Sequence, residues 1–375
     1  MSKASLYVNA KGFSVTRHSY SGSQEFSDCA RRYYLKRVAG WSERKKSAAM
    51  EFGNSVEAGF KEFHARGIES ALSTFCAKWA TFKDAELDYS DKLDNWEACN
   101  LTGQEMLRLY AIRYPRMPFV VAHPEMLQSQ RSYEIFPGTD LAGIELISYM
   151  DIVAKLKPGA ADPALENDRV ILDMKVSAAA CPTLVSLDPQ LRTYSMVEKI
   201  PTVGFLWFGV TSRTLKPGAE VTILEDVPNF KAGSNVLVLS LDRKMIPTIP
   251  PSVYICSTAT MVEFEKITGQ KVDDKAAREK FIADFGTLTP ISTLTRQEID
   301  VRMGTITEES REDMRKQIEQ DVIRIHHASE SDFWPMQGGV RFPNNKCTMC
   351  AMRGICSGND KMRDELVVRI QEEII

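Results

Sequence analysis

The sequence predicts an α/β (α+β) fold in which a central mixed sheet is flanked by helices. Two patterns support this class. Between residues 50 and 114, apolar residues recur every three or four positions and proline is absent, which is typical of packed helices. After Gln130, short segments rich in β-branched and aromatic residues alternate with turn residues, which is typical of strands. With 375 residues, of which 43% are hydrophobic, the chain can bury such a core without disulfides.

The first third of the chain is expected to be helical. Aliphatic and aromatic residues lie at helical spacing over residues 26–38, which places Cys29 at the start of a helix. Two longer helices are expected over residues 50–80 and 84–114, because both stretches keep the helical period and the next prolines follow only after them.

The middle of the chain is expected to form the sheet. Turn residues at Pro137-Gly138 and Pro158-Gly159 separate its segments. Helices come before, between and after the strands, which favours a mixed sheet with helices packed on it. We expect strands at residues 132–136, 145–156, 170–176, 203–210, 221–224 and 236–241, an exposed loop at 157–168, and helices at 187–199, 262–285 and 296–327.

These elements divide the chain into four expected regions. The first is a helical N-terminal region, residues 1–130, which carries Cys29 and Glu57. The catalytic core is expected at residues 131–243, a mainly helical insertion at 244–337, and a cysteine-rich C-terminal segment at 338–375.

Charge and hydropathy limit the classes of function. The formal net charge is −3, so a surface for phosphate groups must be a local patch. The first residues lack a hydrophobic signal core, and no apolar run approaches the ~18 residues of a membrane span, so we expect a cytoplasmic protein without membrane contact. In that reducing setting the eight cysteines are expected to be thiols or metal ligands.

The densest basic region begins within the first expected helix, residues 26–38, and continues beyond its end. Its cations alternate with Tyr33, Tyr34 and Trp41, and such groups can contact phosphates and stack on bases. A solvated helix face is an equally good interpretation. The cations are Arg31, Arg32, Lys36, Arg37, Arg44, Lys45 and Lys46.

Charged residues interrupt two strands that are otherwise apolar. Side chains alternate across a sheet, so Asp173 and Lys175 point to the same face, and a neighbouring strand can bring Asp151 beside them. This set suits metal-dependent phosphodiester hydrolysis, in which oxygen ligands hold Mg²⁺ or Mn²⁺ and the metal acidifies a water. Gln190 and Tyr194 are neighbours on one helix face. Taken singly, these residues are more typical of structural roles: solvated strand residues or a Lys175–Asp173 ion pair for the charged ones, and an exposed polar helix face for Gln190 and Tyr194.

A second set consists of cysteines. Cys347, Cys350 and Cys356 lie within ten residues, and the distant Cys29 can complete a four-thiolate site for zinc or a [4Fe–4S] cluster. Spacing alone does not separate these two occupants. The other cysteines are scattered and are expected to be small buried residues: Cys76, Cys99, Cys181 and Cys256.

Taken in order, these motifs resemble the PD-(D/E)XK nuclease superfamily, and in particular its RecB-like branch with a four-cysteine iron–sulfur clasp, such as AddB-type subunits and CRISPR adaptation exonucleases. The resemblance spans most of the chain. It rests on Cys29, Gly53-x3-Glu57, Asp151, Asp173-x-Lys175, Gln190-x3-Tyr194 and Cys347-x2-Cys350-x5-Cys356.

The resemblance implies a restriction-endonuclease-like core and a role for each motif. Glu57, Asp151, Asp173 and the Met174 carbonyl would hold Mg²⁺ or Mn²⁺, and Lys175 would assist the attacking water. Gln190 and Tyr194 would contact the DNA strand and support the site. The four cysteines would hold a [4Fe–4S] cluster, with zinc as the alternative. Glu57 stands where the RecB-like motif usually has a histidine, which favours hard cations.

The implied activity is a DNA exonuclease that acts on ends or single strands in recombination, repair or phage DNA processing, in a bacterial cell or a phage-infected host. The chain has no P-loop motif for a helicase, so unwinding would require a helicase or recombinase partner. Two other classes stay open: a catalytically silent nucleic-acid-binding or scaffold protein of the same fold, and a zinc-stabilised structural protein in which the carboxylates are incidental.

Overall fold

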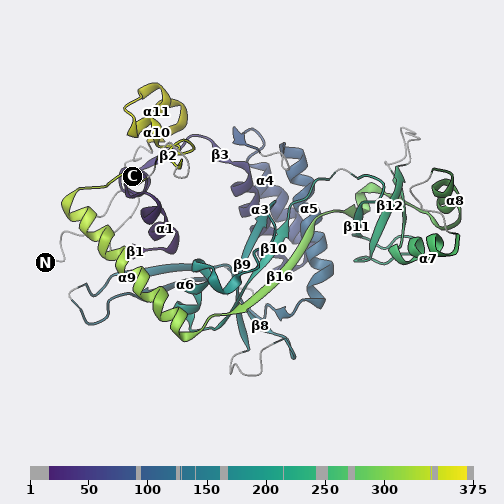
Figure 1. Cartoon of the computed structure of the whole chain (residues 1–375), viewed down its shortest axis with the longest axis horizontal. Coiled ribbons are helices and arrows are strands. Elements are labelled where there is room, and N and C mark those ends of the chain that lie inside the picture. The colour runs from purple at the N-terminus through teal and green to yellow at the C-terminus, as the bar shows by residue number, and fades with distance from the viewer. Residues whose placement is uncertain are drawn as a thin grey trace.

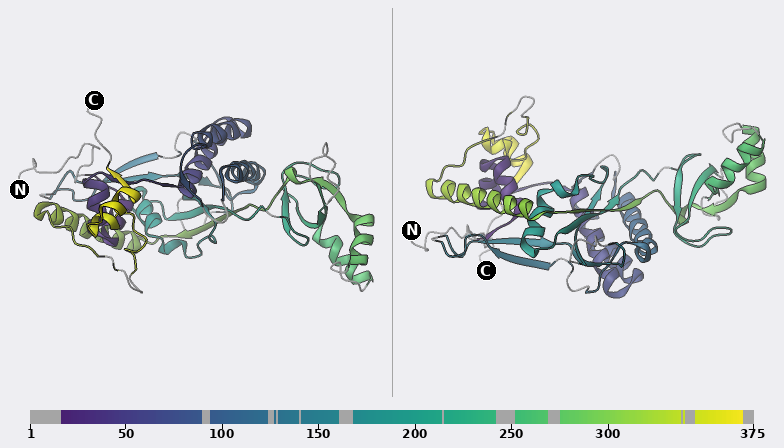
Figure 2. Two further views of the ribbon diagram at one scale, coloured as in Figure 1. Left: turned by 90° about the horizontal axis from the view of Figure 1, so that it is seen from above. Right: turned by 60° about the horizontal axis from the view of Figure 1, so that its bottom comes forward.

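The structure, a computed structural model, describes residues 17–89, 94–123, 127, 129–139, 141–160, 168–213, 215–241, 252–268, 275–337, 339 and 345–369. The molecule is elongated, and a central sheet with its helices lies between two smaller units (Figures 1 and 2). We call them the terminal unit, made by residues 20–43 and 308–369, and the distal unit, made by residues 220–295.

The central sheet has five strands and is mixed. Only its central pair, β9 and β10, is parallel, while the other pairs are antiparallel, which confirms the expected mixed α/β class. All residues of β10 are buried, so its sequence is almost continuously apolar. In spatial order the strands are β16 (Glu298–Thr305), β10 (Thr202–Gly209), β9 (Arg169–Ser177), β8 (Ile152–Leu156) and β5 (Phe119–Val120).

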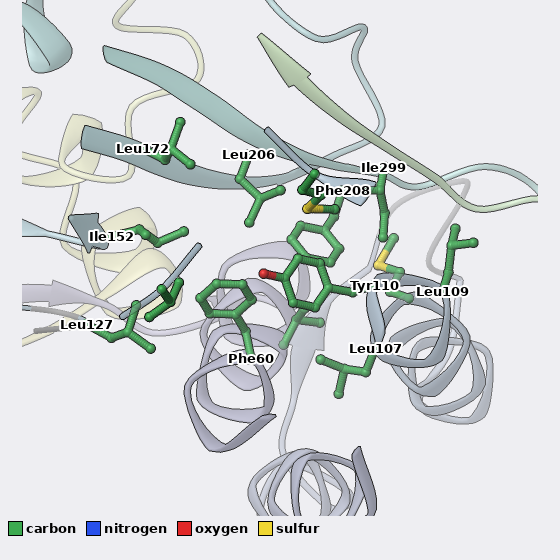
Figure 3. Packing of buried hydrophobic residues seen from close by; sticks show 14 of the residues in the cluster. Phe60, Leu107, Leu109, Tyr110, Leu127, Ile152, Leu172, Leu206, Phe208 and Ile299 are labelled. Carbon is green, nitrogen blue, oxygen red and sulfur yellow. The ribbon is translucent and has the colours of Figure 1, made fainter. Parts of the chain in front are cut away.

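Three helices cover one face of this sheet (Figure 1): α3 (Ala48–Arg66), α4 (Ile68–Ala80) and α5 (Trp96–Arg113). The expected helix over 50–80 is interrupted at Gly67, whose φ of 87° suits glycine. Figure 3 shows side chains of α3 and α5 packed against those of β8, β9 and β10. A Cβ on Gly103 would lie 2.1 Å from the Phe75 ring, so glycine lets α4 and α5 pack closely.

Helix α6 (Pro189–Glu198) packs on the opposite face, where Leu191 and Tyr194 join a buried cluster with Phe205 and Trp207 of β10. The helix begins where Asp188 accepts a hydrogen bond from the Leu191 amide at 2.9 Å, with proline at the first helical position. A short 3₁₀ turn, Val185–Leu187, precedes it.

The expected strand over residues 145–156 is divided at Asp151. Its first half, β7 (Glu145–Met150), belongs to a separate three-stranded sheet with β1 (Arg17–His18) and β6 (Ser129–Glu134), whereas its second half, β8, pairs with β9. The chain therefore passes from one sheet to the other at Asp151. Apolar residues continue on both sides of this point, so the sequence pattern alone does not reveal the break.

The terminal unit joins the two ends of the described chain. The expected helix over residues 26–38 is interrupted at Cys29, which is extended with φ −167° and separates α1 (Tyr20–Asp28) from α2 (Ala30–Tyr33). A π-helical turn, η2 (Tyr34–Val38), follows. The unit also contains β2 (Trp41–Glu43), α9 (Glu308–Ser331), α10 (Arg353–Cys356), α11 (Asp360–Leu366) and β17 (Val367–Arg369), and β17 pairs with β2.

The distal unit contains the first part of the segment over residues 244–337, for which a mainly helical insertion is expected. It holds a five-stranded antiparallel sheet with two helices, α7 (Thr258–Thr268) and α8 (Lys275–Phe285). Its strands are β11 (Glu220–Ile223), β12 (Asn235–Leu241), β13 (Ser252–Cys256), β14 (Thr287–Pro290) and β15 (Leu294–Thr295). A short parallel pair elsewhere joins β3 (Lys46–Ser47) to β4 (Leu87–Asp88).

The expected helix over residues 296–327 was wrong in its first third. Ile299, Val301 and Met303 alternate with polar residues, and this period of two forms β16, which completes the central sheet. The helix α9 begins only at Glu308, after Thr307 accepts a hydrogen bond from the Ser310 amide. Among the described helices, none is long and apolar enough to cross a membrane.

Candidate active site

The candidate site is centred on β9, where Asp173 and Lys175 project from the same face. Asp173 is only 1% exposed, and its Oδ2 lies 2.6 Å from the Lys175 ammonium. Burial disfavours the charged form and raises the pKa of Asp173 above its usual range, although Lys175 opposes this shift. A buried carboxylate with a single ammonium partner is therefore the core of the site.

Helix α6 adds two polar side chains above this pair. Gln190 donates from Nε2 to Asp173 Oδ1 at 2.9 Å and to the Tyr194 hydroxyl at 2.6 Å. Its Oε1 accepts from Lys175 Nζ at 3.4 Å. The structure thus brings Gln190 and Tyr194 into the carboxylate cluster, and Tyr194, at 5% exposed, does not belong to a solvated helix face.

Asp151 reaches the same cluster from the joint between the two sheets. Its Oδ2 accepts a hydrogen bond from the backbone amide of Met174 at 2.8 Å. Burial, followed by the charges of Asp173 and Glu57, raises the pKa of Asp151 to about 8. The folded site without a metal therefore disfavours the charged form of Asp151.

Glu57 approaches from α3, on the other face of the sheet. A Cβ on Gly53 would lie 4.0 Å from Val176 Cβ, so α3 passes close to β9 one helical turn before Glu57. The half-buried Glu57 carboxylate is near enough for its charge to raise the pKa of Asp151. The motif Gly53-x3-Glu57 therefore lies beside the strand that carries Asp173 and Lys175.

The donor set fits a divalent cation. Glu57, Asp151 and Asp173 supply carboxylate oxygens that repel one another in a largely buried place, and Lys175 offsets only part of their charge. Hard cations such as Mg²⁺ and Mn²⁺ prefer oxygen ligands of this kind. In the residues that the structure describes, no three His, Cys, Asp or Glu side chains lie close enough together to hold a metal.

His64 lies apart from this set. Its Nε2 is 2.9 Å from the Tyr110 hydroxyl, and its ring packs against Phe60, Phe63 and Tyr114. Burial lowers the pKa of His64 to about 4, so the ring is neutral in the folded protein. His64 is therefore a core residue of the helical layer.

One residue near the site, Asp188, was not singled out from the sequence. Asp188, which caps α6, adds its negative charge to the burial that raises the pKa of Asp173. Asp188 likewise adds to the burial that raises the pKa of Tyr20, so the start of α1 lies near the start of α6. The signal for Asp188 was present, because an Asp-Pro pair before a helical segment is a strong start signal.

The four cysteines of the second set border one cavity of about 500 Å³ in the terminal unit. Cys29 comes from the junction of α1 and α2, and the other three come from the segment that ends with α10. Burial raises the pKa of the Cys350 and Cys356 thiols, while Arg32 and Arg31, respectively, oppose the shift. In the described residues the thiols surround a common space without forming a closed metal-binding cluster.

Several contacts independently tie the two ends of the chain around this cavity. Lys346 Nζ lies 2.6 Å from Asp28 Oδ1, and Trp334 stacks on Tyr33 with ring centroids 6.0 Å apart. The Arg31 amide donates to the Pro335 carbonyl at 3.1 Å. The N-terminal and C-terminal segments therefore form one unit.

The basic region expected to contact DNA is largely paired with acidic side chains. Arg32, Lys36 and Arg37 surround the buried Glu25 carboxylate at 3.7, 3.2 and 3.0 Å. Lys45 pairs with Glu86. The region thus carries less free positive charge than its sequence indicates, and its role in DNA binding stays a prediction.

The comparison with known families agrees with this geometry. A model of a family described as the PD-(D/E)XK nuclease superfamily matches residues 17–357, which include Glu57 and both cysteine segments. None of the curated proteins gives a significant match.

Proposed function

The chain belongs to the PD-(D/E)XK nuclease superfamily, and on this premise we propose that it is a metal-dependent exonuclease that acts on DNA ends or single strands. Membership indicates a metal-dependent nuclease with a nucleic-acid substrate. The observation that carries the proposal is the convergence of Asp151, Asp173, Lys175 and Gln190 at the joint between the two sheets.

Each residue has a defined task in this proposal. Glu57, Asp151, Asp173 and the Met174 carbonyl would hold Mg²⁺ or Mn²⁺, which when bound polarises the phosphate and acidifies a water. Lys175 orients that water and offsets the charge that develops on the phosphate. Gln190 bonds to both Asp173 and Lys175, so it fixes their relative orientation, and Tyr194 in turn holds Gln190.

The preference for ends or single strands rests on the resemblance to the RecB-like branch, whose clasped members often process ends. A helicase or recombinase partner and a setting in bacterial or phage recombination or repair belong to the same proposal. The division of the chain into a catalytic core and flanking regions is also part of this proposal.

We further propose that Cys29, Cys347, Cys350 and Cys356 hold a [4Fe–4S] cluster. Their common cavity supports this, as do the nearby Arg31 and Arg32, because a cluster with four thiolate ligands carries negative charge. The sequence contains one Cys-x2-Cys pair in this region, whereas zinc ribbons usually have two. Broad absorption near ~400 nm and bound iron would support the cluster, and colourless zinc-loaded protein would contradict it.

The activity is tested with end-labelled single-stranded, double-stranded and circular DNA, with Mg²⁺ or Mn²⁺ and with chelator. We expect the linear substrates to be degraded from their ends, and Lys175→Ala and Asp173→Ala to abolish degradation. Intact DNA after incubation with folded, metal-loaded protein would favour a silent nucleic-acid-binding protein. Cleavage of the circles would contradict an obligate exonuclease.

A further inference from the structure

A second cavity, of about 510 Å³, lies beside the candidate active site at the ends of β9 and β10. In sheet register Lys175 pairs with Trp207, and Trp207 pairs with Asp300, so these side chains form a row on one face. Neighbouring strands are ~4.8 Å apart, which places Trp207 about one strand spacing from Lys175. Trp207 and Asp300 border the cavity. It therefore lies next to the position at which the phosphate would react.

Trp207 has an unusual environment for a buried tryptophan. Its side chain is largely buried, with the residue 8% exposed, and its indole N–H meets no acceptor in the described residues. A Cβ on Gly209 would lie 2.3 Å from the indole ring, so the ring extends along β10 over this glycine. A buried donor without an acceptor destabilises the folded state, and such a group in a native protein calls for an explanation.

The charges around the cavity balance. Arg302 Nε lies 2.8 Å from Asp300 Oδ2, and its guanidinium donates to the Cys181 carbonyl at 3.0 Å. The remaining charged residues, Arg113 and Glu298, have opposite signs. A pocket without net charge does not favour a phosphate. Its mixture of donors, acceptors and an indole edge suits a flat, uncharged group that forms hydrogen bonds.

We infer that this cavity takes the base of the nucleotide adjacent to the cleaved phosphate. The inference rests on the proposed nuclease function and deepens it, because a base can enter the cavity only when it is unpaired and turned out of the stack. The substrate strand would thus be single-stranded at the active site. The Trp207 ring, which borders the cavity, would pack against the edge of this base.

The rim offers a variant that fills the cavity without entering the core. Ala179 is exposed, and its amide donates to Ser177 Oγ at 3.0 Å, which gives the rim a defined turn. Ala179→Trp would place a large side chain over the cavity. Leu184→Trp is the matched control, since Leu184 lies on the same loop, is 67% exposed and does not border the cavity.

The experiment measures binding of labelled single-stranded oligonucleotides in Ca²⁺, and separately their cleavage in Mg²⁺. A single abasic nucleotide is moved along each strand. We expect one position next to the cleaved bond at which base loss weakens binding to the unaltered protein about tenfold, or ~1.4 kcal/mol. Ala179→Trp should bind the intact strand about tenfold more weakly and lose the abasic effect at that position only. Trp207→Phe should reduce the effect partially.

The outcomes separate this inference from the nuclease proposal. If the protein cleaves DNA but binds all abasic strands equally well, and Ala179→Trp does not change this binding, the base pocket is wrong. The proposed nuclease activity would then still hold. A position-specific abasic effect on binding without cleavage would retain the pocket and overturn the nuclease. Equal losses in Ala179→Trp and Leu184→Trp would also count against the pocket.

Discussion

Asp151 accepts a hydrogen bond from the backbone amide of Met174 at 2.8 Å, at the point where β8 ceases to pair with β9. The last pair in this ladder joins Ile152 to Leu172, so the carboxylate takes the place that another strand residue would occupy. One contact thus joins the two sheets and brings the Asp151 carboxylate beside Asp173. Asp151 therefore has two roles: it links the two sheets, and it belongs to the candidate site.

Asp151→Asn should separate these two roles. The amide oxygen can still accept from Met174, so the fold should survive, whereas the charge needed for metal is lost. We expect nuclease activity to fall at least ~100-fold, because a bound metal contributes several kcal/mol to such reactions. Activity and thermal unfolding are measured on the same preparation.

Asp151→Ala is the comparison for that variant. It removes the acceptor as well as the charge, so it should lower the melting temperature while Asp151→Asn does not. Wild-type activity in either variant would show that Asp151 is not a ligand.

Gln190→Ala should reduce turnover without preventing metal binding. Gln190 forms hydrogen bonds with both Asp173 and Lys175, so it fixes the relative orientation of these side chains. Gln190 itself is not expected to be a metal ligand. We expect kcat to fall about 10- to 100-fold, a loss of roughly 1.4–2.7 kcal/mol, with Mn²⁺ affinity changed much less. The two quantities are measured by steady-state kinetics and calorimetry.

Tyr194→Phe provides the graded control for Gln190. It removes the hydroxyl that accepts from Gln190 but leaves the bond from Gln190 to Asp173. Its loss of turnover should therefore be smaller than that of Gln190→Ala. A larger loss would assign Tyr194 a direct role that the present geometry does not give it.

The sequence predicted which side chains of the candidate site lie on a common face, but it did not predict all of the elements that surround them. The alternation in β9 placed Asp173 and Lys175 on one face, and the i, i+4 spacing placed Gln190 beside Tyr194. The break at Asp151 was missed because apolar residues typical of strands continue on both sides of it. Trp207 gave no signal, because a tryptophan in an apolar strand is ordinary until its neighbours in the sheet are known.

The missed strand β16 shows a different limit. Ile299, Val301 and Met303 alternate correctly, but the segment continues into a long helical pattern, and the two periods were merged. Pairing with β10, almost 100 residues earlier in the chain, decides its conformation. Long-range pairing of this kind leaves little mark on local sequence.

The burial of His64 should make the stability of the folded protein depend on pH, independently of catalysis. Its pKa is about 4 in the folded protein and 6.5 for an exposed histidine, so the unfolded chain binds a proton more readily. This contribution to stability is fully present above pH 6.5 and is lost as the pH falls towards 4. Between pH 7 and pH 5 the loss should be about 2 kcal/mol.

His64→Gln tests this prediction, since glutamine can keep a hydrogen bond to Tyr110 without titrating. Urea unfolding at pH 7 and pH 5 should show a smaller decrease in the variant than in the wild-type protein. Nuclease activity at neutral pH should be unchanged. Equal decreases in both proteins would show that His64 is not the titrating group.

Removal of a cysteine ligand should affect the terminal unit more than the chemistry. Cys29 and Cys347 lie 318 positions apart in the chain and face one cavity, so a shared metal group would crosslink its two ends. Metal-binding energy then appears as stability of the joined segments. We expect Cys29→Ser and Cys347→Ser to lose absorbance near ~400 nm and to become sensitive to protease in residues 345–369.

Cys76→Ser is the control, because Cys76 packs in the helical layer away from the cavity. If Cys29→Ser kept the chromophore and the protease resistance, the N-terminal cysteine would not be a ligand, and the two ends would be held by β2, β17 and the Lys346–Asp28 pair alone.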